Sequence, residues 1–224
     1  MMPENIIFDD LSKMVAVWCG VGTGSNELAR VAEFVMEKNI SILSVTPESI
    51  RVIWPWLENV KTDIFARFYL SDKKISEHQI SDLTVNINNA FKSGACGAQL
   101  FLPYDALDSL VEQTRVVRDD LFFNKQLSIG VDINEIDSSD WEKLFLNLQK
   151  INATVLTLIL TKDMGDKSDF VGRIYGMLNS WDDNNRFSLH FVFGQNYLRM
   201  EQAFRLIKSV KPELVNGVKF FVNY

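Results

Sequence analysis

Short apolar runs alternate along the chain with longer segments of helical periodicity. Eight such runs recur at intervals of roughly 25 to 30 residues. They are Val15–Cys19, Ile40–Val45, Ile64–Leu70, Ala98–Leu102, Leu127–Ile133, Val155–Thr161, Phe187–Phe193 and Val218–Val222. Regular alternation of strands and helices requires parallel strands with crossover helices. Because eight such units make a (β/α)₈ barrel, the pattern predicts a single α/β domain with the TIM-barrel fold over residues 1–224.

The predicted helices have local start and stop signals. The segment from Glu77 to Ser93 is followed by Gly94, in the position of a C-terminal cap with positive φ. Pro55 in the second crossover indicates a short or kinked helix. Serines are expected to cap three other helices, namely Ser25, Ser139 and Ser168.

The sequence ends at Tyr224, directly after the eighth run, and leaves no residues for an eighth helix. The outer faces of strands eight and one are therefore expected to form an apolar wall of Phe220, Val222, Val15 and Val17. Soluble monomers rarely expose a contiguous apolar patch above a few hundred Å². Either the N-terminal segment Pro3–Lys13 covers this wall, or a second copy does so in a symmetric homodimer.

Composition and charge limit the classes of partner and the cellular compartment that we expect for this protein. Hydrophobic residues at 47% and charged residues at 23% are typical of a globular protein. A net charge of -6 without a basic cluster argues against a nucleic-acid partner. Cys19 and Cys96 have no disulfide spacing, and no apolar run reaches the 18 or so residues of a membrane span. We expect a cytoplasmic protein that neither enters a membrane nor is secreted.

Alternation along the strands predicts which side chains face the barrel interior. Strand five sets the parity, because Ile129 and Val131 suit the helix-facing side and thereby direct Ser128, Gly130, Asp132 and Asn134 inward. The same rule directs inward Ser44, Thr46, Arg67, Tyr69, Gln99, Phe101, Thr157, Thr161, Ser188, His190, Lys219, Phe221 and Asn223. Barrel interiors are usually filled by Val, Ile and Leu, so this set is too polar for packing alone.

The interior set contains the candidates for catalysis. An ionised group buried without a partner costs several kcal/mol, so we expect Arg67, Asp132, His190 and Lys219 to share hydrogen bonds. Asp132 and His190 would transfer a proton while Arg67 holds an anionic or carbonyl oxygen. The expected substrate-binding residues are Gln99, Asn134, Thr157, Tyr69 and Lys162. A buried Arg67–Asp132 pair that only fills space is the alternative.

No other motif indicates a bound cofactor. Histidine, cysteine and carboxylate residues do not have the spacing of a metal site, and we expect neither a metal nor a cofactor. The glycine-rich run Gly20–Gly24 after strand one is a weak candidate for holding a phosphate by its backbone N–H groups.

Two segments resemble the deoxyribose-phosphate aldolase family. They are Asn89–Leu102 around strand four, with Ser93-Gly94-Ala95, and Ile42–Ile50 at strand two, with Val45-Thr46-Pro47. The resemblance implies a class I aldolase barrel, in which a strand-six lysine forms a Schiff base while a strand-four aspartate and a strand-seven lysine assist. The matching positions here are Thr157, Gln99 and His190. A Schiff base needs a primary amine, so the resemblance implies a divergent barrel without the catalytic lysine at that position.

Three functions remain open from the sequence. The first is an aldolase- or lyase-type enzyme acting on a small carbonyl metabolite, with or without a phosphate, at the C-terminal mouth of the barrel. The second is a catalytically inactive barrel that serves in binding or assembly, and the third is a sugar isomerase or epimerase. An open mouth in which Arg67, Asp132 and His190 converge would favour an enzyme, and a plugged mouth would favour the second.

Overall fold

Eight parallel strands close into a barrel in the order β1 to β8, with β8 hydrogen-bonded to β1. The computed structural model describes residues 13–114, 125–160, 167–182, 184–194 and 196–224. The strands are β1 (Val15–Trp18), β2 (Ile42–Val45), β3 (Asp63–Tyr69), β4 (Gly97–Phe101), β5 (Gln126–Asp132), β6 (Val155–Ile159), β7 (Ser188–Gly194) and β8 (Lys219–Asn223). The TIM-barrel fold predicted from the sequence is confirmed.

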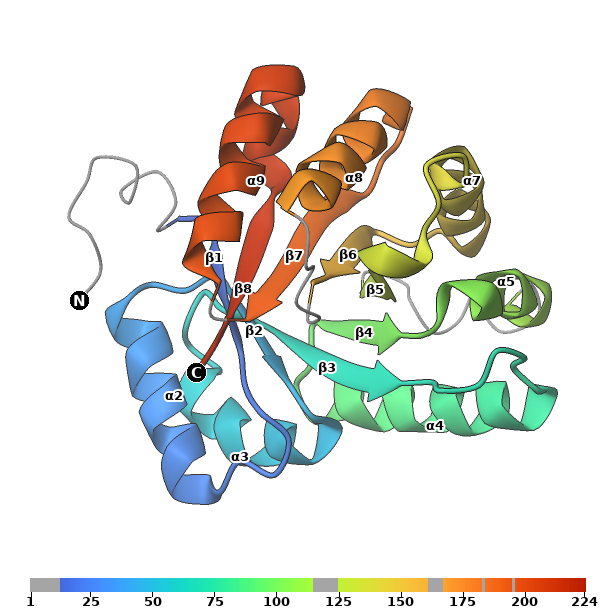
Figure 1. Cartoon of the computed structure of the whole chain (residues 1–224). Coiled ribbons are helices and arrows are strands. Elements are labelled where there is room, and N and C mark those ends of the chain that lie inside the picture. Colours follow the sequence, from blue (N-terminus) through green and yellow to red (C-terminus); the bar gives the residue numbers. More distant parts are fainter. Residues whose placement is uncertain (1–12, 115–124, 161–166, 183, 195) are drawn as a thin grey trace.

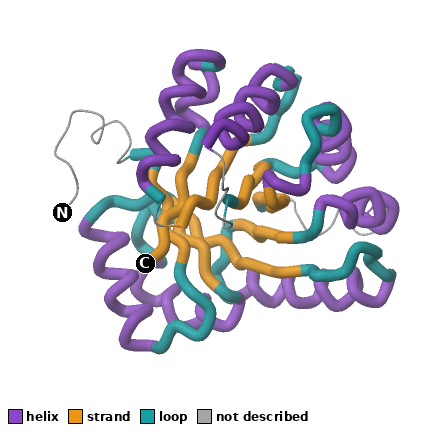
Figure 2. The backbone as a smooth tube through the Cα atoms, viewed as in Figure 1, coloured by secondary structure: helices purple, strands orange, loops and turns teal. Residues whose placement is uncertain are grey.

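Helices surround the strands on the outside of the barrel (Figures 1 and 2). They are α2 (Ser25–Glu37), α3 (Pro47–Leu57), α4 (Glu77–Lys92), α5 (Leu107–Thr114), α7 (Trp141–Ile151), α8 (Lys167–Ser180) and α9 (Tyr197–Val210). Short 3₁₀ turns are η1 (Tyr104–Ala106), η2 (Ile133–Glu135) and η3 (Pro212–Gly217). Each described helix connects consecutive parallel strands, as a right-handed crossover requires.

Helix ends were predicted less accurately than strands. Gly94 follows α4 with a φ of 112°, as expected for a residue just past a helix. Gly24 rather than Ser25 precedes α2, because the Glu27 carboxylate accepts a hydrogen bond from the Gly24 N–H and completes the cap. Asp140 rather than Ser139 precedes α7, and its carbonyl accepts the first helical bond from Leu144. Ser168 lies within α8 instead of before it.

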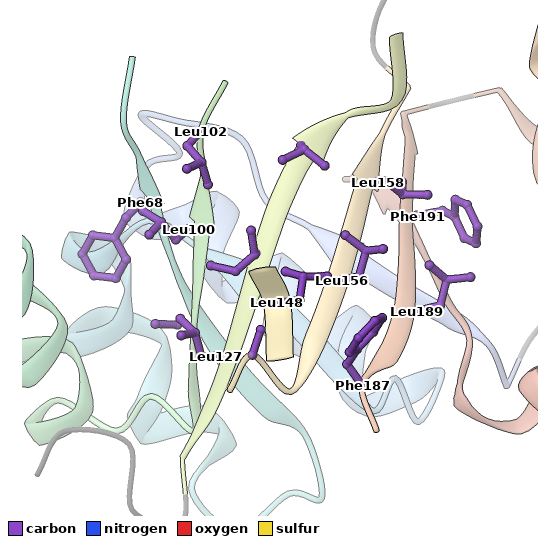
Figure 3. Close-up of a cluster of buried hydrophobic side chains, with 14 of the residues drawn as sticks. Phe68, Leu100, Leu102, Leu127, Leu148, Leu156, Leu158, Phe187, Leu189 and Phe191 are labelled. Carbon is purple, nitrogen blue, oxygen red and sulfur yellow. The ribbon is translucent and has the colours of Figure 1, made fainter. Parts of the chain in front are cut away.

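The main apolar core lies between the barrel and the helices. Ile129 and Val131 of β5 are fully buried in it, which confirms the predicted parity of that strand. Figure 3 shows Leu156 and Leu158 of β6 in this layer, with Leu148 of α7 packed nearby. Complete burial of such a side chain stabilises the fold by roughly 1.5–3 kcal/mol.

A second, smaller apolar cluster lies inside the barrel. Its buried members are Ala16, Ile42, Phe65, Val192 and Phe221, and Trp18 and Ile159 pack against it. Four polar side chains within the barrel are also completely buried, namely Ser44, Gln99, Ser128 and Thr157. The interior is therefore divided between apolar and polar side chains.

The expected apolar wall on strands eight and one is only partly present. Val17 and Phe220 are completely buried, and Phe220 stacks on Phe191 and Phe193 with ring centroids 5.6 and 5.7 Å apart. Val15 and Val222 are half-buried against the core. The prediction of an exposed wall is wrong for Val17 and Phe220, because Phe220 is covered by the aromatic stack of β7 and β8 and Val17 is buried in the main core.

The cover over the half-buried part of the wall, at Val15 and Val222, stays a prediction. Residues 3–12 of the segment Pro3–Lys13 lie outside the described residues. Light scattering at micromolar concentration tests the expected homodimer. A strictly monomeric mass would contradict stable dimerisation and leave the N-terminal segment as the cover.

A close contact at Gly130 gives a stability prediction. A Cβ atom there would lie 2.1 Å from the Phe101 ring, so the ring would have to move. Phe101 is buried against Trp18 and Tyr69, and overpacking of this kind costs about 1–3 kcal/mol. We expect Gly130→Ala to lower the free energy of unfolding in urea by this amount.

The matched control for Gly130→Ala is Gly172→Ala on α8. No atom lies within 4 Å of a Cβ at Gly172, and alanine is favoured over glycine in a helix by about 0.5–1 kcal/mol. This variant should therefore be slightly more stable than the wild type. Equal effects of the two substitutions would contradict the packing described for Phe101.

Candidate active site

The carboxyl ends of the strands form the face of the barrel where TIM-barrel enzymes bind their substrates. Trp18, Tyr69, Phe101 and Asp132 are the last residues of β1, β3, β4 and β5. Arg67 and Gln99 lie two positions earlier on β3 and β4, and they are register partners. The candidate site thus has an upper level at the mouth and a polar level beneath it.

The polar level is built from hydrogen-bonded pairs. The Ser44 hydroxyl donates to Oε1 of Gln99, and the hydroxyls of Ser128 and Thr157 lie 2.7 Å apart. The Nε2 group of Gln99 is buried and has no hydrogen-bond partner among the described residues. This level consequently has an unused donor on β4.

Arg67 is the charged group of this level. Its side chain is only 2% exposed, and its guanidinium lies 3.9 Å from the ring centroid of Trp18. Nη2 donates to the carbonyl of Cys19, whereas Nε and Nη1 have no partner in the described part of the chain. Burial lowers the pKa of Arg67, although the nearby Tyr69 and Cys19 act in the opposite direction. The guanidinium is therefore a buried cation without a carboxylate partner among these residues.

Aromatic side chains occupy the upper level above Arg67. The Trp18 ring packs edge-on against Phe101 and Phe221, with centroids 5.1 and 5.9 Å apart. Tyr69 stacks on Phe101 at 5.4 Å and is 56% exposed. Burial raises the pKa of the Tyr69 hydroxyl, and the Arg67 charge lowers it. These rings separate the polar level from solvent and form the floor of the mouth.

Asp132 lies at the rim of the mouth, at the end of β5. It is half-buried, and its Oδ1 accepts hydrogen bonds from the backbone N–H and the side-chain amide of Asn134, at 2.9 and 2.8 Å. The strand ends here, so Asn134 belongs to η2 and not to the strand run predicted to extend through Ile133. The Asn134 side chain fixes the Asp132 carboxylate at the mouth.

His190 lies deep in the barrel, beside Thr157 in the strand register. It is 3% exposed, its ring lies 5.6 Å from that of Phe221, and its Nδ1 has no partner in the described chain. Burial, with a smaller contribution from Lys219, lowers the pKa of His190 to about 3. The imidazole is therefore neutral at physiological pH.

The four titratable groups predicted to share hydrogen bonds do not do so. No hydrogen bond or ion pair between the described residues joins any two of Arg67, Asp132, His190 and Lys219. Lys219 lies at the opposite end of the barrel, where Nζ donates to the Lys13 carbonyl at 2.9 Å. Arg67 is turned toward β1 and Asp132 toward Asn134, so the predicted cluster and the buried Arg67–Asp132 pair are both wrong.

Two further residues complete the comparison with the sequence predictions. Lys162 lies outside the described residues, as does Thr161. Trp18 was not selected from the sequence, yet it contacts both Arg67 and Phe101. The alternation on β1 contained the signal, because the outward position of Val17 directs Trp18 into the barrel.

Other parts of the described chain provide no second catalytic centre. A groove of about 680 Å³ is lined by residues of α3 and α4, among them Glu48, Arg51 and Asn89, and it reaches Arg67 and Tyr69 of β3, so it adjoins the candidate site. The described residues contain no group of three or more His, Cys, Asp or Glu side chains placed to hold a metal ion. No described helix is long and apolar enough to cross a membrane.

Comparisons with known proteins relate this architecture to aldolases. No protein-family model matches the sequence, and no curated protein matches it. The structure is similar to a putative deoxyribose-phosphate aldolase from Coccidioides immitis, with a TM-score of 0.72 and 9% identity over 99% of this chain and 84% of that one. It is also similar to the aldolase QR15, with a TM-score of 0.69 and 11% identity over 96% of this chain and 91% of that one.

A tetrameric deoxyribose phosphate aldolase from Aeropyrum pernix is a third similar structure. The TM-score is 0.68 at 8% identity, over 96% of this chain and 87% of that one. Similarity at these identities establishes a shared fold. The aldolase-like barrel implied by the segments around strands two and four is thereby confirmed at the level of the fold.

Proposed function

We propose that this barrel is a lyase-type enzyme that binds a small carbonyl metabolite at its C-terminal mouth. The observation that carries this proposal is the Arg67 guanidinium, buried beneath the mouth with two unpartnered nitrogens. A buried charge without a partner is costly to the folded state. Such a group is retained at a site where a ligand supplies the missing anionic or carbonyl oxygen, and the aldolase-like fold supports a carbonyl compound as that ligand.

Asp132 is the residue that we assign to proton transfer. It lies at the rim, accepts two hydrogen bonds from Asn134, and keeps its second carboxylate oxygen for a substrate. A carboxylate so placed removes a proton next to the carbonyl of a compound that Arg67 holds by an anionic or carbonyl oxygen. Tyr69 would cover the bound molecule, while Gln99 and Thr157 would act from the polar level below.

The proposed chemistry does not use a Schiff base on the described strands. The inward positions of β6 are occupied by Val155, Thr157 and Ile159, and none of these side chains is an amine. His190 on β7 is neutral and deeply buried, so we no longer assign it to proton transfer. Lys162, which lies outside the described residues, remains a candidate for substrate binding.

Borohydride trapping tests the absence of a Schiff base. The protein, incubated with small aldehydes and ketones and then reduced, is expected to keep its unmodified intact mass. Peptide mapping of any adduct would locate the amine. Covalent capture at Lys162 or Lys219 would contradict the proposal and assign the reaction to a relocated lysine.

A non-catalytic binding barrel is the second candidate function. It is favoured by the aromatic floor, which leaves the polar level almost without solvent exposure, as Gln99 and Thr157 illustrate. Both candidates bind a ligand at the mouth, and they differ in whether Asp132 moves a proton. An isomerase or epimerase shares that proton transfer with the lyase and differs only in the later steps.

Exchange of carbon-bound protons with solvent distinguishes the candidates. Carbonyl compounds are incubated with the protein in D₂O, and loss of the proton next to the carbonyl is followed by NMR. We expect at least one compound to exchange, and Asp132→Asn to reduce its rate by about 10²- to 10⁴-fold. Asn134→Asp is the companion variant, because it removes the amide that holds Asp132. Binding without exchange in the wild type would contradict the enzyme and support the binding barrel.

A further inference from the structure

In the described part of the barrel interior, three unpartnered donor atoms lie on neighbouring strands, while a fourth unpartnered atom, Nδ1 of His190, lies apart from them on β7. Nε and Nη1 of Arg67 and Nε2 of Gln99 are buried and have no partner among the described residues. Arg67 and Gln99 are direct register partners on β3 and β4, and neighbouring strands lie about 4.8 Å apart. Their side chains project from the same face, so their free N–H groups can reach one small molecule.

The surrounding acceptors are already in use. Oε1 of Gln99 accepts from Ser44, and the Cys19 carbonyl accepts from Nη2 of Arg67. Asp132 lies above this level, at the rim, where its Oδ1 accepts from Asn134. What remains at this level is positively charged and offers donors only. Its complement is a small anion whose oxygens act as acceptors.

The position of Trp18 selects the shape of that anion. The indole covers one face of the guanidinium, with 3.9 Å between Cζ of Arg67 and the ring centroid. The in-plane edges of the guanidinium therefore remain for hydrogen bonding. Carboxylates and phosphates both accept two parallel hydrogen bonds along such an edge, but a phosphate carries further oxygens that would need donors beyond Arg67 and Gln99.

We propose that the ligand is a carboxylate-bearing carbonyl compound of the 2-oxo acid class, whose carboxylate is held by Arg67 and Gln99. This inference rests on the proposed function, which places a carbonyl compound at the mouth. Trp18 is half-buried and Tyr69 is exposed, so the carboxylate enters between these two rings. The carbonyl group next to it then extends toward the rim.

Calorimetric titration with matched probes tests the proposal without requiring turnover. Pyruvate and its uncharged methyl ester share the 2-oxopropanoyl group, and inorganic phosphate represents the other common oxyanion. We expect pyruvate to bind the wild type, and the ester and phosphate to bind at least 10-fold more weakly. A hydrogen bond to a charged group accounts for a difference of about 10- to 100-fold.

Two variants and one control locate the site. Arg67→Met removes the cation, and Gln99→Glu places a carboxylate beside Arg67 that competes with the ligand. Both are expected to weaken pyruvate binding by about 10- to 100-fold. Arg30→Met, which removes an exposed arginine on α2, should leave the affinity unchanged.

Each of the other possible results of these titrations would overturn one part of the proposal. Equal binding of pyruvate and its methyl ester would overturn the carboxylate assignment and leave the proposed carbonyl function standing. Preference for phosphate would replace the carboxylate with a phosphate. Pyruvate binding that survives in both Arg67→Met and Gln99→Glu would place the anion elsewhere. Absence of pyruvate binding to the wild type would overturn the 2-oxo acid class, while proton exchange with other carbonyl compounds would still support the proposed function.

Discussion

The Arg67→Met variant is expected to be more stable than the wild type, by about 1–3 kcal/mol in the free energy of unfolding. The wild type buries the guanidinium at 2% exposure, and two of its nitrogens lack partners in the described chain. Methionine retains an apolar stem of similar length against Trp18 and removes the desolvated charge. A residue kept for ligand binding at the expense of stability should show this gain.

Urea unfolding of the two proteins without added ligand measures the gain. Arg30→Met is the matched control, because Arg30 is exposed on α2 and its loss should change stability by less than about 0.5 kcal/mol. If Arg67→Met lowered the free energy of unfolding by more than about 1 kcal/mol, Arg67 would instead stabilise the folded barrel. The bond from Nη2 to the Cys19 carbonyl would then be its main role.

His190 is expected to make the protein less stable as the pH falls. Its pKa is about 3 in the folded protein, below the ordinary value of 6.5, so the unfolded chain binds the proton more readily. Stability is therefore unaffected by this group above pH 6.5 and declines from there toward pH 3. Between pH 7.5 and pH 5 the contribution of His190 should fall by about 2 kcal/mol.

The comparison with His190→Leu isolates this contribution. Both proteins are unfolded in urea at pH 7.5 and pH 5, and the wild type should lose about 2 kcal/mol more than the variant. His78→Gln is the matched control, because His78 is the other histidine and its side chain is 85% exposed beside Asp82. Identical pH dependence of the wild type and His190→Leu would show that His190 is protonated in the folded barrel.

The fold was predictable because apolar and polar residues alternate along the strands and show which side chains face the barrel interior. Ile129 and Val131 alternate with Ser128 and Asp132, and this one strand was sufficient to place its neighbours' side chains correctly. The register then follows from closing eight parallel strands. Helix caps were wrong by one residue at Ser25 and Ser139, because the capping partner depends on the local turn rather than on residue preference alone.

The candidate site was predictable in its members and not in its contacts. Parity places Arg67, Gln99 and His190 inside the barrel, as the structure also does. Parity does not give the height of each residue along the barrel axis or the rotamer of a long side chain. Arg67 therefore contacts Trp18, and Asp132 contacts Asn134, although both had been expected to meet His190.

Thermal-shift screening of wild type and Arg67→Met against one library of small carbonyl metabolites tests the central claim most directly. A ligand at 100 times its dissociation constant stabilises a protein by about 2.7 kcal/mol, which is readily measured as a rise in Tm. We expect at least one carbonyl compound to raise the Tm of the wild type and to leave that of Arg67→Met unchanged. Equal shifts in the two proteins, or no shift with any compound, would contradict a binding site built around Arg67.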